Sequence, residues 1–205
     1  MRVRKPARKD EASNLYLGHE NRRGNDLLAH SFRARLCRNR IVAPVVAEFQ
    51  EEAKTTRRVL ERVPASKLHW KPHAKSMSLG QLALHIASVP GRFVQIVQKD
   101  EHEIDPSNFR FEEPKSTEEI LAVFDKSEHD AGTYLRGLTD QQARANWSLK
   151  GRGRTIFTKS RMEVVRMIML SHIYHHRGQL SVYLRQLDVP VPSIYGPSAD
   201  DNPFV

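Results

Sequence analysis

The amino-acid sequence predicts an all-α fold, a four-helix bundle with irregular loops and a flexible N-terminal extension. Four long stretches repeat apolar side chains every three to four positions, which is the spacing of one face of an α-helix. Segments rich in proline, glycine and polar residues separate these stretches. No stretch shows a strong alternation of apolar and polar residues, so the pattern favours helices packed on helices.

The first two predicted helices differ in how they begin and end. The first spans residues 41–63, and Pro64 ends it because a proline ring crowds the preceding helical turn. The second begins after Ser78, whose hydroxyl is a typical N-terminal cap. Pro90 and Gly91 predict a kink within this second helix, because proline lacks the N–H of one helical hydrogen bond.

The third predicted helix spans residues 116–138. Its start carries a capping box, in which Ser116 or Thr117 pairs with Glu119. We expect residues 139–160 to form a longer loop, with some extended structure as the alternative.

The fourth predicted helix runs from Arg161 to Leu187. The final segment, VPVPSIYGPSADDNPF, is rich in proline, glycine and aspartate and predicts an irregular strap. The apolar stripe of the fourth helix consists of Val165, Ile168, Met169, Ile173, Leu180, Tyr183, Leu184 and Leu187.

Residues 1–40 carry most of the excess positive charge. They contain 11 Lys and Arg against 4 Asp and Glu, whereas the remaining 165 residues contain 22 and 20. Because residues 1–40 lack a sustained apolar period, we expect a basic, disordered extension followed by a domain at residues 41–205. The extension has three interpretations: a solvated tail, a weak phosphate-binding arm, or an upstream segment that reflects the choice of start site. The nearly neutral domain does not favour a nucleic-acid partner.

The sequence predicts a cytoplasmic protein. Cys37 is the only cysteine, which excludes an internal disulfide and a cysteine-based zinc cluster. No apolar run is long enough to cross a bilayer, so we expect no membrane partner. The first residues also lack the apolar core of a secretory signal peptide.

The stretch LSHIYHHRGQL places His172 and His176 four positions apart on the fourth helix. Residues at this spacing lie on one face of a helix, and both histidines fall in or beside the core-facing stripe. Their two imidazoles can therefore reach one metal ion. The alternative is that they bond to each other, to backbone or to water, and the motif is too short to decide.

His85 is the candidate for a third ligand. It lies at the edge of the apolar face of the second helix, where a lone histidine is more often a hydrogen-bonded core residue. The pair on another inward face strengthens its assignment as a ligand. Three neutral imidazoles leave a fourth tetrahedral position for water or substrate. His175 and Glu52 are candidates for an acid–base or orienting role, with a solvated role as the alternative.

Three further residues follow the histidine motif. Gly178 lowers helix propensity by roughly 1 kcal/mol relative to alanine, so we expect either a close neighbouring helix or space near a metal. Arg177 and Gln179 fit an interface or a pocket, and their spacing does not choose between the two.

Three motifs, LHWKPHAKSMSLGQLALHIA, HIYHHRGQLSVYLRQL and VPSIYGPSADD, together resemble the DinB-like (damage-inducible protein DinB) family. The resemblance covers residues 41–203 in order and spacing, and residues 1–40 lie outside it. It implies a DinB/YfiT-like four-helix bundle of up-down-down-up type, often a homodimer.

The resemblance also implies a divalent metal ion held by three histidines, which are His85, His172 and His176 in this sequence. The wider superfamily includes thiol-dependent S-transferases and isomerases as well as hydrolases. A low-molecular-weight thiol is therefore a candidate second cofactor. Zn, Ni and Fe are all candidate ions, because imidazole ligands suit each of them.

Two functions fit these observations. The first is a metal-dependent transferase or hydrolase, whose open coordination position activates water or binds a thiol as thiolate. The alternative is a non-catalytic metal-binding module of a stress response. The sequence assigns no catalytic residue. Nucleic-acid binding through residues 1–40 is a third hypothesis, which the scarcity of aromatic residues there does not favour.

Overall fold

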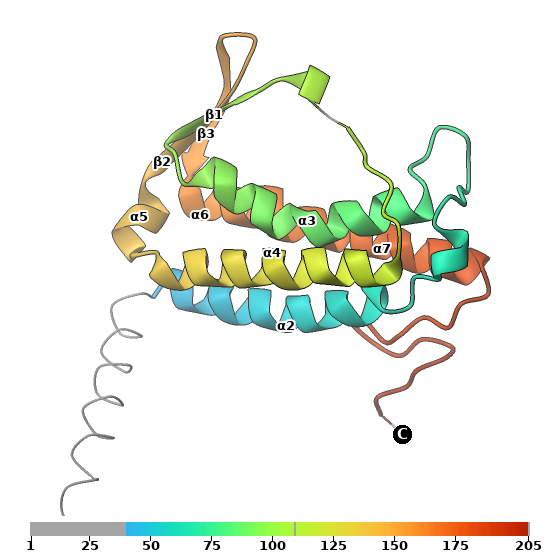
Figure 1. Ribbon diagram of the computed structural model, residues 1–205. Coiled ribbons are helices and arrows are strands. Elements are labelled where there is room, and N and C mark those ends of the chain that lie inside the picture. Colours follow the sequence, from blue (N-terminus) through green and yellow to red (C-terminus); the bar gives the residue numbers. More distant parts are fainter. Residues whose placement is uncertain (1–39, 109, 205) are drawn as a thin grey trace, which may run out of the picture. The chain divides into compact units, whose positions relative to one another are not determined.

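Four long helical stretches lie along one another in the computed structural model, which describes residues 40–108 and 110–204 (Figure 1). α3 packs against α4 and α7, and α2 packs against the same two helices. The predicted extension lies outside the described residues except for Arg40, and Cys37 also lies outside them. The long helices are α2 (Val42–Leu60), α3 (Leu79–Val97), α4 (Thr117–Gly137) and α7 (Ser171–Gln186).

A small three-stranded sheet corrects the all-α prediction. Its strand order is β1-β2-β3, with β1 parallel to β2 and β2 antiparallel to β3. The chain is therefore mostly helical with a small sheet at one end of the helices (Figure 1). The strands are β1 (Glu101–Ile104), β2 (Asn146–Gly151) and β3 (Arg154–Ser160), and the short helices are η1 (Ala65–Lys67), η2 (Pro106–Asn108), α5 (Asp140–Arg144) and α6 (Arg161–Val164).

The hairpin of β2 and β3 lies within residues 139–160, so the extended structure that was the alternative to a loop is what forms there. Trp147 and Leu149 are buried on either side of Ser148, so the strand has the expected alternation over only a few residues. Arg152 and Gly153, both with positive φ, form the two-residue turn, as tight hairpins require. A short strand of this kind gives too little periodicity to stand out from the surrounding polar sequence.

The predicted helix starts are confirmed. The Ser78 hydroxyl accepts the N–H of Gln81 and the Gln81 side chain bonds back to the Ser78 N–H, which completes a capping box at α3. At α4, the Ser116 hydroxyl accepts the N–H of Glu119. The Glu119 carboxylate accepts instead from the N–H of Lys115, so only half of the predicted capping box forms.

α3 continues through Pro90 without interruption. Next to the proline, the Gly91 N–H donates to the Ser127 hydroxyl of α4 at 2.6 Å. A Cβ on Gly91 would lie 3.0 Å from that same oxygen. The glycine therefore permits α3 and α4 to approach closely, and the hydroxyl satisfies a backbone donor beside the proline.

The predicted fourth helix is not a single α-helix. α6 leads into a π-helical segment, η3 (Val165–Leu170), and α7 begins directly after it. Each residue that widens a turn displaces the following side chains by about 100° around the axis. The π-helical segment therefore sets the direction in which His172 and His176 project, a feature that α-helical periodicity alone does not reveal.

The buried apolar residues predicted for the helices form the core. Val45 and Phe49 of α2 and Phe93 of α3 pack with the sheet residue Trp147, whereas Leu82 and Leu180 belong to a second cluster toward the other end. Among the described helices, none combines the length and the apolar character that crossing a membrane requires.

Candidate metal centre

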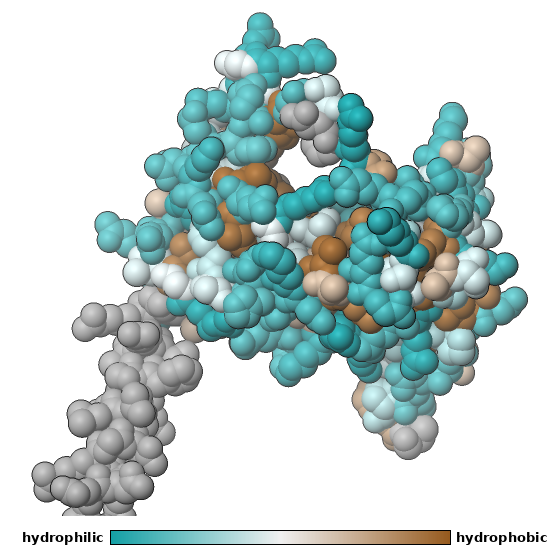
Figure 2. All heavy atoms as spheres, in the orientation of Figure 1, coloured by the Kyte–Doolittle hydropathy of each residue, from teal (hydrophilic) through white to brown (hydrophobic). Residues whose placement is uncertain are grey.

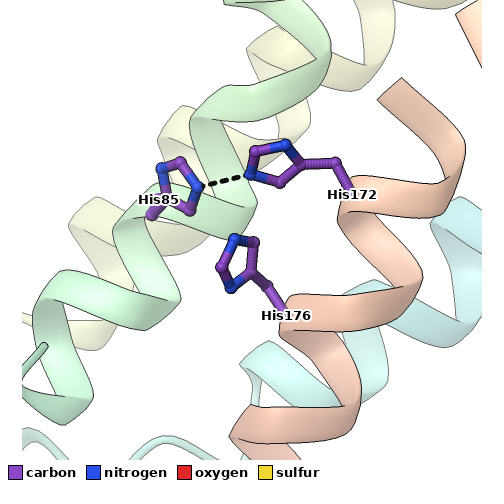
Figure 3. Close-up of side chains that lie close together, drawn as sticks. All are labelled: His85, His172 and His176. Atoms are coloured by element: carbon purple, nitrogen blue, oxygen red, sulfur yellow. Dashed lines mark hydrogen bonds between the residues drawn. The ribbon is translucent and has the colours of Figure 1, made fainter. Parts of the chain in front are cut away.

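The three predicted histidines converge. His85 projects from α3, and His172 and His176 project from α7 toward it (Figure 3). One ring nitrogen from each lies within 4.8 Å of the other two. The ring centroids are 4.6 to 5.0 Å apart. In the described part of the chain, this is the one group of histidine, cysteine and carboxylate side chains with such a spacing.

Two of the imidazoles are hydrogen-bonded to each other. The Nε2 atoms of His85 and His172 are 2.8 Å apart, so one must donate its proton and the other must accept. Two nitrogens bound to one tetrahedral ion at 2.0–2.1 Å stand about 3.4 Å apart. Small side-chain rotations could move the two nitrogens apart by roughly another half ångström, and two metal–nitrogen bonds would then replace this hydrogen bond. The three imidazoles therefore fit a divalent ion in donor type and in spacing.

The third imidazole is oriented by a neighbour one turn away. His176 Nδ1 lies 2.7 Å from the Gln179 side-chain oxygen, which can only accept a hydrogen bond. The proton of His176 therefore lies on Nδ1, and Nε2 carries the lone pair that a metal needs. Gln179 was open to two interpretations in the sequence, and its contact assigns it to the site.

The surroundings keep all three histidines neutral. Burial, together with repulsion from the neighbouring imidazoles and Arg92, lowers the pKa of His85 to about 4. Burial and the adjacent histidines also lower the pKa of His172 to about 4. The pKa of His176 is lowered by burial, against the opposing effect of its bond to Gln179. Neutral imidazole is the form that binds metals, so protons compete weakly at neutral pH.

A cavity of about 600 Å³ opens beside the histidines. Its wall is formed by α3, β1, β2 and η3 and is largely apolar, with Phe93, Ile104 and Leu149 among the lining residues. Figure 2 shows apolar surface in brown beneath the segment that joins β1 to α4. His102 also lines this cavity. The imidazole cluster is thus accessible to a small molecule and partly shielded from water.

The segment that joins β1 to α4 is fastened to the start of α3. Both carboxylate oxygens of Glu113 accept from the Ser78 hydroxyl, at 2.8 and 2.9 Å. The Gln81 side chain donates to the carbonyl oxygen of Phe111. These bonds hold the Phe111 ring edge-on to His85, with centroids 5.7 Å apart. Sequence reasoning missed this contribution, because the polar loop has no periodicity.

Two other candidates do not join the cluster. His175 is exposed, although its ring contacts that of His176 at a centroid distance of 4.8 Å. Glu52 was open to an orienting or a solvated role, and it orients no imidazole: its carboxylate binds Arg177 at 2.6 Å and the hydroxyl of Tyr195 at 3.1 Å. Consecutive residues differ by about 100° around a helix axis, so His176 and Arg177 point to different faces of α7. Glu52 lies on the face of the arginine.

Arg177 is buried, with 1% of its surface exposed. Besides the Glu52 carboxylate, its guanidinium donates to the backbone oxygen of Glu52, to the Thr56 hydroxyl and to the Tyr195 hydroxyl. The Tyr195 ring also lies against it, 5.1 Å from the guanidinium carbon. Arg177 thus joins α7 to α2 and to the C-terminal segment, which settles its role as structural.

The C-terminal motif is an irregular strap, as predicted. The Asp200 carboxylate accepts from the Val191 N–H and from Arg185 of α7, and Asp201 accepts from the Ser193 N–H. These bonds fold the segment back on itself and attach it to the last helix. The strap in turn presents Tyr195 to Arg177.

Neither a close neighbouring helix nor space near a metal, the two reasons predicted for Gly178, explains this residue. A Cβ at this position would meet open space, so no neighbouring helix approaches it. The residue is also absent from the cavity lining. Nothing in the structure accounts for glycine at this position.

Comparison with known proteins assigns the fold and the family. A crystal structure of a DinB-like protein from Bacillus cereus ATCC 10987 is 21% identical, with a TM-score of 0.58, and covers 73% of this chain and 94% of that one. A DinB-like protein, YjoA, from Bacillus subtilis is 20% identical, with a TM-score of 0.55, and covers 71% and 92%. At these identities the likeness shows the fold alone.

The uncharacterized protein YrdA of Bacillus subtilis strain 168 is 46% identical over 35 residues, which are 17% of this chain and 21% of that relative. The match thus spans about a fifth of YrdA. The DinB family model matches residues 39–202, which include all three clustered histidines and the strap. This protein belongs to the DinB family.

Proposed function

We propose that His85, His172 and His176 bind one divalent metal ion, and that the protein is a metal-dependent enzyme of transferase or hydrolase type. The observation that carries the proposal is the convergence of three neutral imidazoles beside an open, largely apolar cavity. Three protein ligands leave a coordination position for water or substrate, whereas closed structural sites use four.

When bound, the ion would supply Lewis acidity or a water of lowered pKa, and it could hold a thiol as thiolate. The chain supplies the remaining functions. Gln179 fixes the tautomer of His176, and Phe111 limits the access of water to His85. The one cysteine, Cys37, lies far from the histidine motifs in sequence and outside the described residues, and we propose that a reacting thiol comes from a small cofactor. Zn, Ni and Fe remain the candidate ions.

The alternative is a metal-binding stress-response module without catalysis. It is favoured because neither acid–base candidate is placed to act as a general base: the Glu52 carboxylate binds Arg177 and Tyr195, and His175 is exposed. Screening the metal-loaded protein against thiol-conjugation and hydrolysis substrates separates the two functions. Turnover that a chelator abolishes would support the enzyme.

We further propose a DinB/YfiT-like four-helix bundle that assembles as a cytoplasmic homodimer without a nucleic-acid partner. Family membership and the packing of α2, α3, α4 and α7 support the bundle. Sedimentation equilibrium of the full chain tests the dimer, and a mass equal to one chain would contradict it.

The metal site is tested by the metal content of the full chain purified without an affinity tag. We expect about one divalent ion per chain by elemental analysis, and a loss of most of it in His85→Ala, His172→Ala and His176→Ala. His175→Ala is the matched control, because it removes a neighbouring imidazole on the same helix outside the cluster. Full metal content in all three cluster variants would overturn the assignment.

A further inference from the structure

The cavity beside the histidines has two chemically different parts. One part is apolar and extends along α3 toward the sheet, where Phe93, Ile96, Ile104, Leu149 and Ile168 line it. The other part is charged and lies between α3 and the segment that includes β1 and the residues after it, where Arg92 and Arg110 line it together with Glu103 and Asp105. A ligand that fills the whole cavity would therefore meet an apolar surface at one end and charged groups at the other.

The acidic groups of the cavity are already engaged. The Glu103 carboxylate accepts the N–H of Gly153 at the tip of the hairpin, at 3.0 Å. The Asp105 carboxylate accepts the N–H and the hydroxyl of Ser107, at 2.9 and 2.7 Å. These bonds direct the Glu103 carboxylate to the hairpin and the Asp105 carboxylate to its own loop.

The two arginines have no such partners. Within residues 40–108 and 110–204, neither Arg92 nor Arg110 forms an ion pair or a side-chain hydrogen bond. Two guanidinium groups that share a cavity wall without an acidic partner favour an anion in the space between them, because arginine donates paired hydrogen bonds to carboxylate or phosphate.

Arg92 is placed to act on a ligand of the metal centre. It follows His85 by seven residues on α3, which is about two turns, or roughly 10 Å along the axis, on the same face. Arg92, Arg110, His85 and Phe111 also line a second, small pocket that adjoins the first. The two arginines therefore share a pocket wall with His85, and Glu112 also lines that small pocket.

We propose that this cavity binds a small amphipathic monocarboxylate, with its carboxylate between Arg92 and Arg110 and its apolar body against Phe93, Ile104 and Leu149. The role of this molecule as substrate rests on the proposed function, because the molecule would be held beside the metal ion. The volume of about 600 Å³ suits a compact molecule with an apolar chain or ring. Because Glu103 and Asp105 accept from Gly153 and Ser107, they do not pair with the two arginines.

The binding itself can be measured without metal or turnover. Isothermal titration of the full chain with octanoate, hexanoate and butanoate tests the apolar part, since each buried methylene group should change affinity by about fourfold. Octan-1-ol and octylammonium have the same chain length and test the charge. Each titration is done on the protein as purified and again after treatment with a chelator.

The variants are Arg92→Gln, Arg110→Gln and the double substitution. Arg62→Gln, an exposed arginine that does not line the cavity, is the matched control. We expect octanoate affinity to fall about tenfold or more in the double variant and to stay unchanged in the control. Octan-1-ol should bind the double variant as it binds the wild type, which shows that the cavity persists.

Three results would overturn the proposal. They are wild-type octanoate affinity in the double variant, octylammonium binding as tight as octanoate, and octanoate binding that disappears after chelation, which would make the carboxylate a metal ligand. A protein that lacks metal yet binds octanoate through the arginines would contradict the proposed function and leave this inference intact.

Discussion

α7 carries two adjacent polar side chains, Arg177 and His176, which point to different faces of the helix and differ in how many hydrogen-bond partners they find there. Arg177 points toward α2, where Glu52, Thr56 and Tyr195 satisfy its donors. His176 points toward α3, where Gln179 takes one ring nitrogen and the other faces two further imidazoles. On the Arg177 face the hydrogen-bonding groups are paired with one another. On the His176 face the nitrogen lone pairs of three imidazoles are directed at a common point.

This difference separates a structural polar group from a binding group. A buried cation whose donors all have partners holds elements together, and removing it leaves the partners unpaired. A cluster of neutral acceptors without enough donors is incomplete, and a cation completes it. The comparison therefore predicts that Arg177 governs stability and that the histidines govern binding.

We expect the largest effect from a substitution on the face of α7 that carries Arg177. Arg177→Ala should lower the free energy of unfolding by about 3–5 kcal/mol, because it strands the half-buried Glu52 carboxylate without its partner. Denaturant titration of the full chain measures this. Arg166→Ala removes an ion pair with Glu48 that is largely exposed, and it should cost less than about 1 kcal/mol. Equal losses in the two variants would contradict a structural role specific to Arg177.

We expect a smaller effect from a substitution on the face of α7 that carries His176. Gln179→Ala removes the bond that fixes the tautomer of His176, so metal affinity should fall by roughly tenfold. Competition against a coloured chelator measures the affinity. The stability of the metal-free protein should change little, because Gln179 is exposed. An unchanged affinity would show that His176 needs no orienting partner.

The smallest expected effect is a pH dependence of the metal-free protein. The folded pKa values of His85 and His172 are about 4, below the usual value near 6.5. As pH falls from 6.5 toward 4, the unfolded chain takes up protons first, so stability present above pH 6.5 is progressively lost.

Unfolding titrations at pH 7, 5.5 and 4.5 measure this loss. The double variant His85→Ala/His172→Ala should lose less stability over the same range than the unmodified chain. Identical pH dependence in the two proteins would show that these imidazoles are not held neutral by the fold.

The long helices and the histidine cluster could be predicted because their signals are local. Ser78 marks the start of α3, and the spacing of His172 and His176 places both on one face whatever precedes them. The assignment of His85 as a ligand depended on a pair of inward-facing histidines on another helix, and His172 and His176 are that pair. Spacing therefore predicts how His172 and His176 lie relative to each other, whereas the direction in which both project depends on the π-helical segment before them.

The rest depends on contacts distant in sequence. β1 pairs with β2 across more than forty residues of chain, and neither strand is long enough to show a pattern. The π-helical segment arises from packing and leaves no mark in the apolar spacing. Phe111 and Arg110 reach the cavity only because Glu113 is bonded to Ser78, a contact between a loop and a helix start.

The most direct test of the metal centre is the anomalous scattering of crystals of the full chain grown with Zn²⁺. The account predicts one strong peak at about 2.0–2.1 Å from a ring nitrogen of each of His85, His172 and His176, and at no such distance from His175. No peak between α3 and α7, or a peak that His85 does not contact, would contradict it.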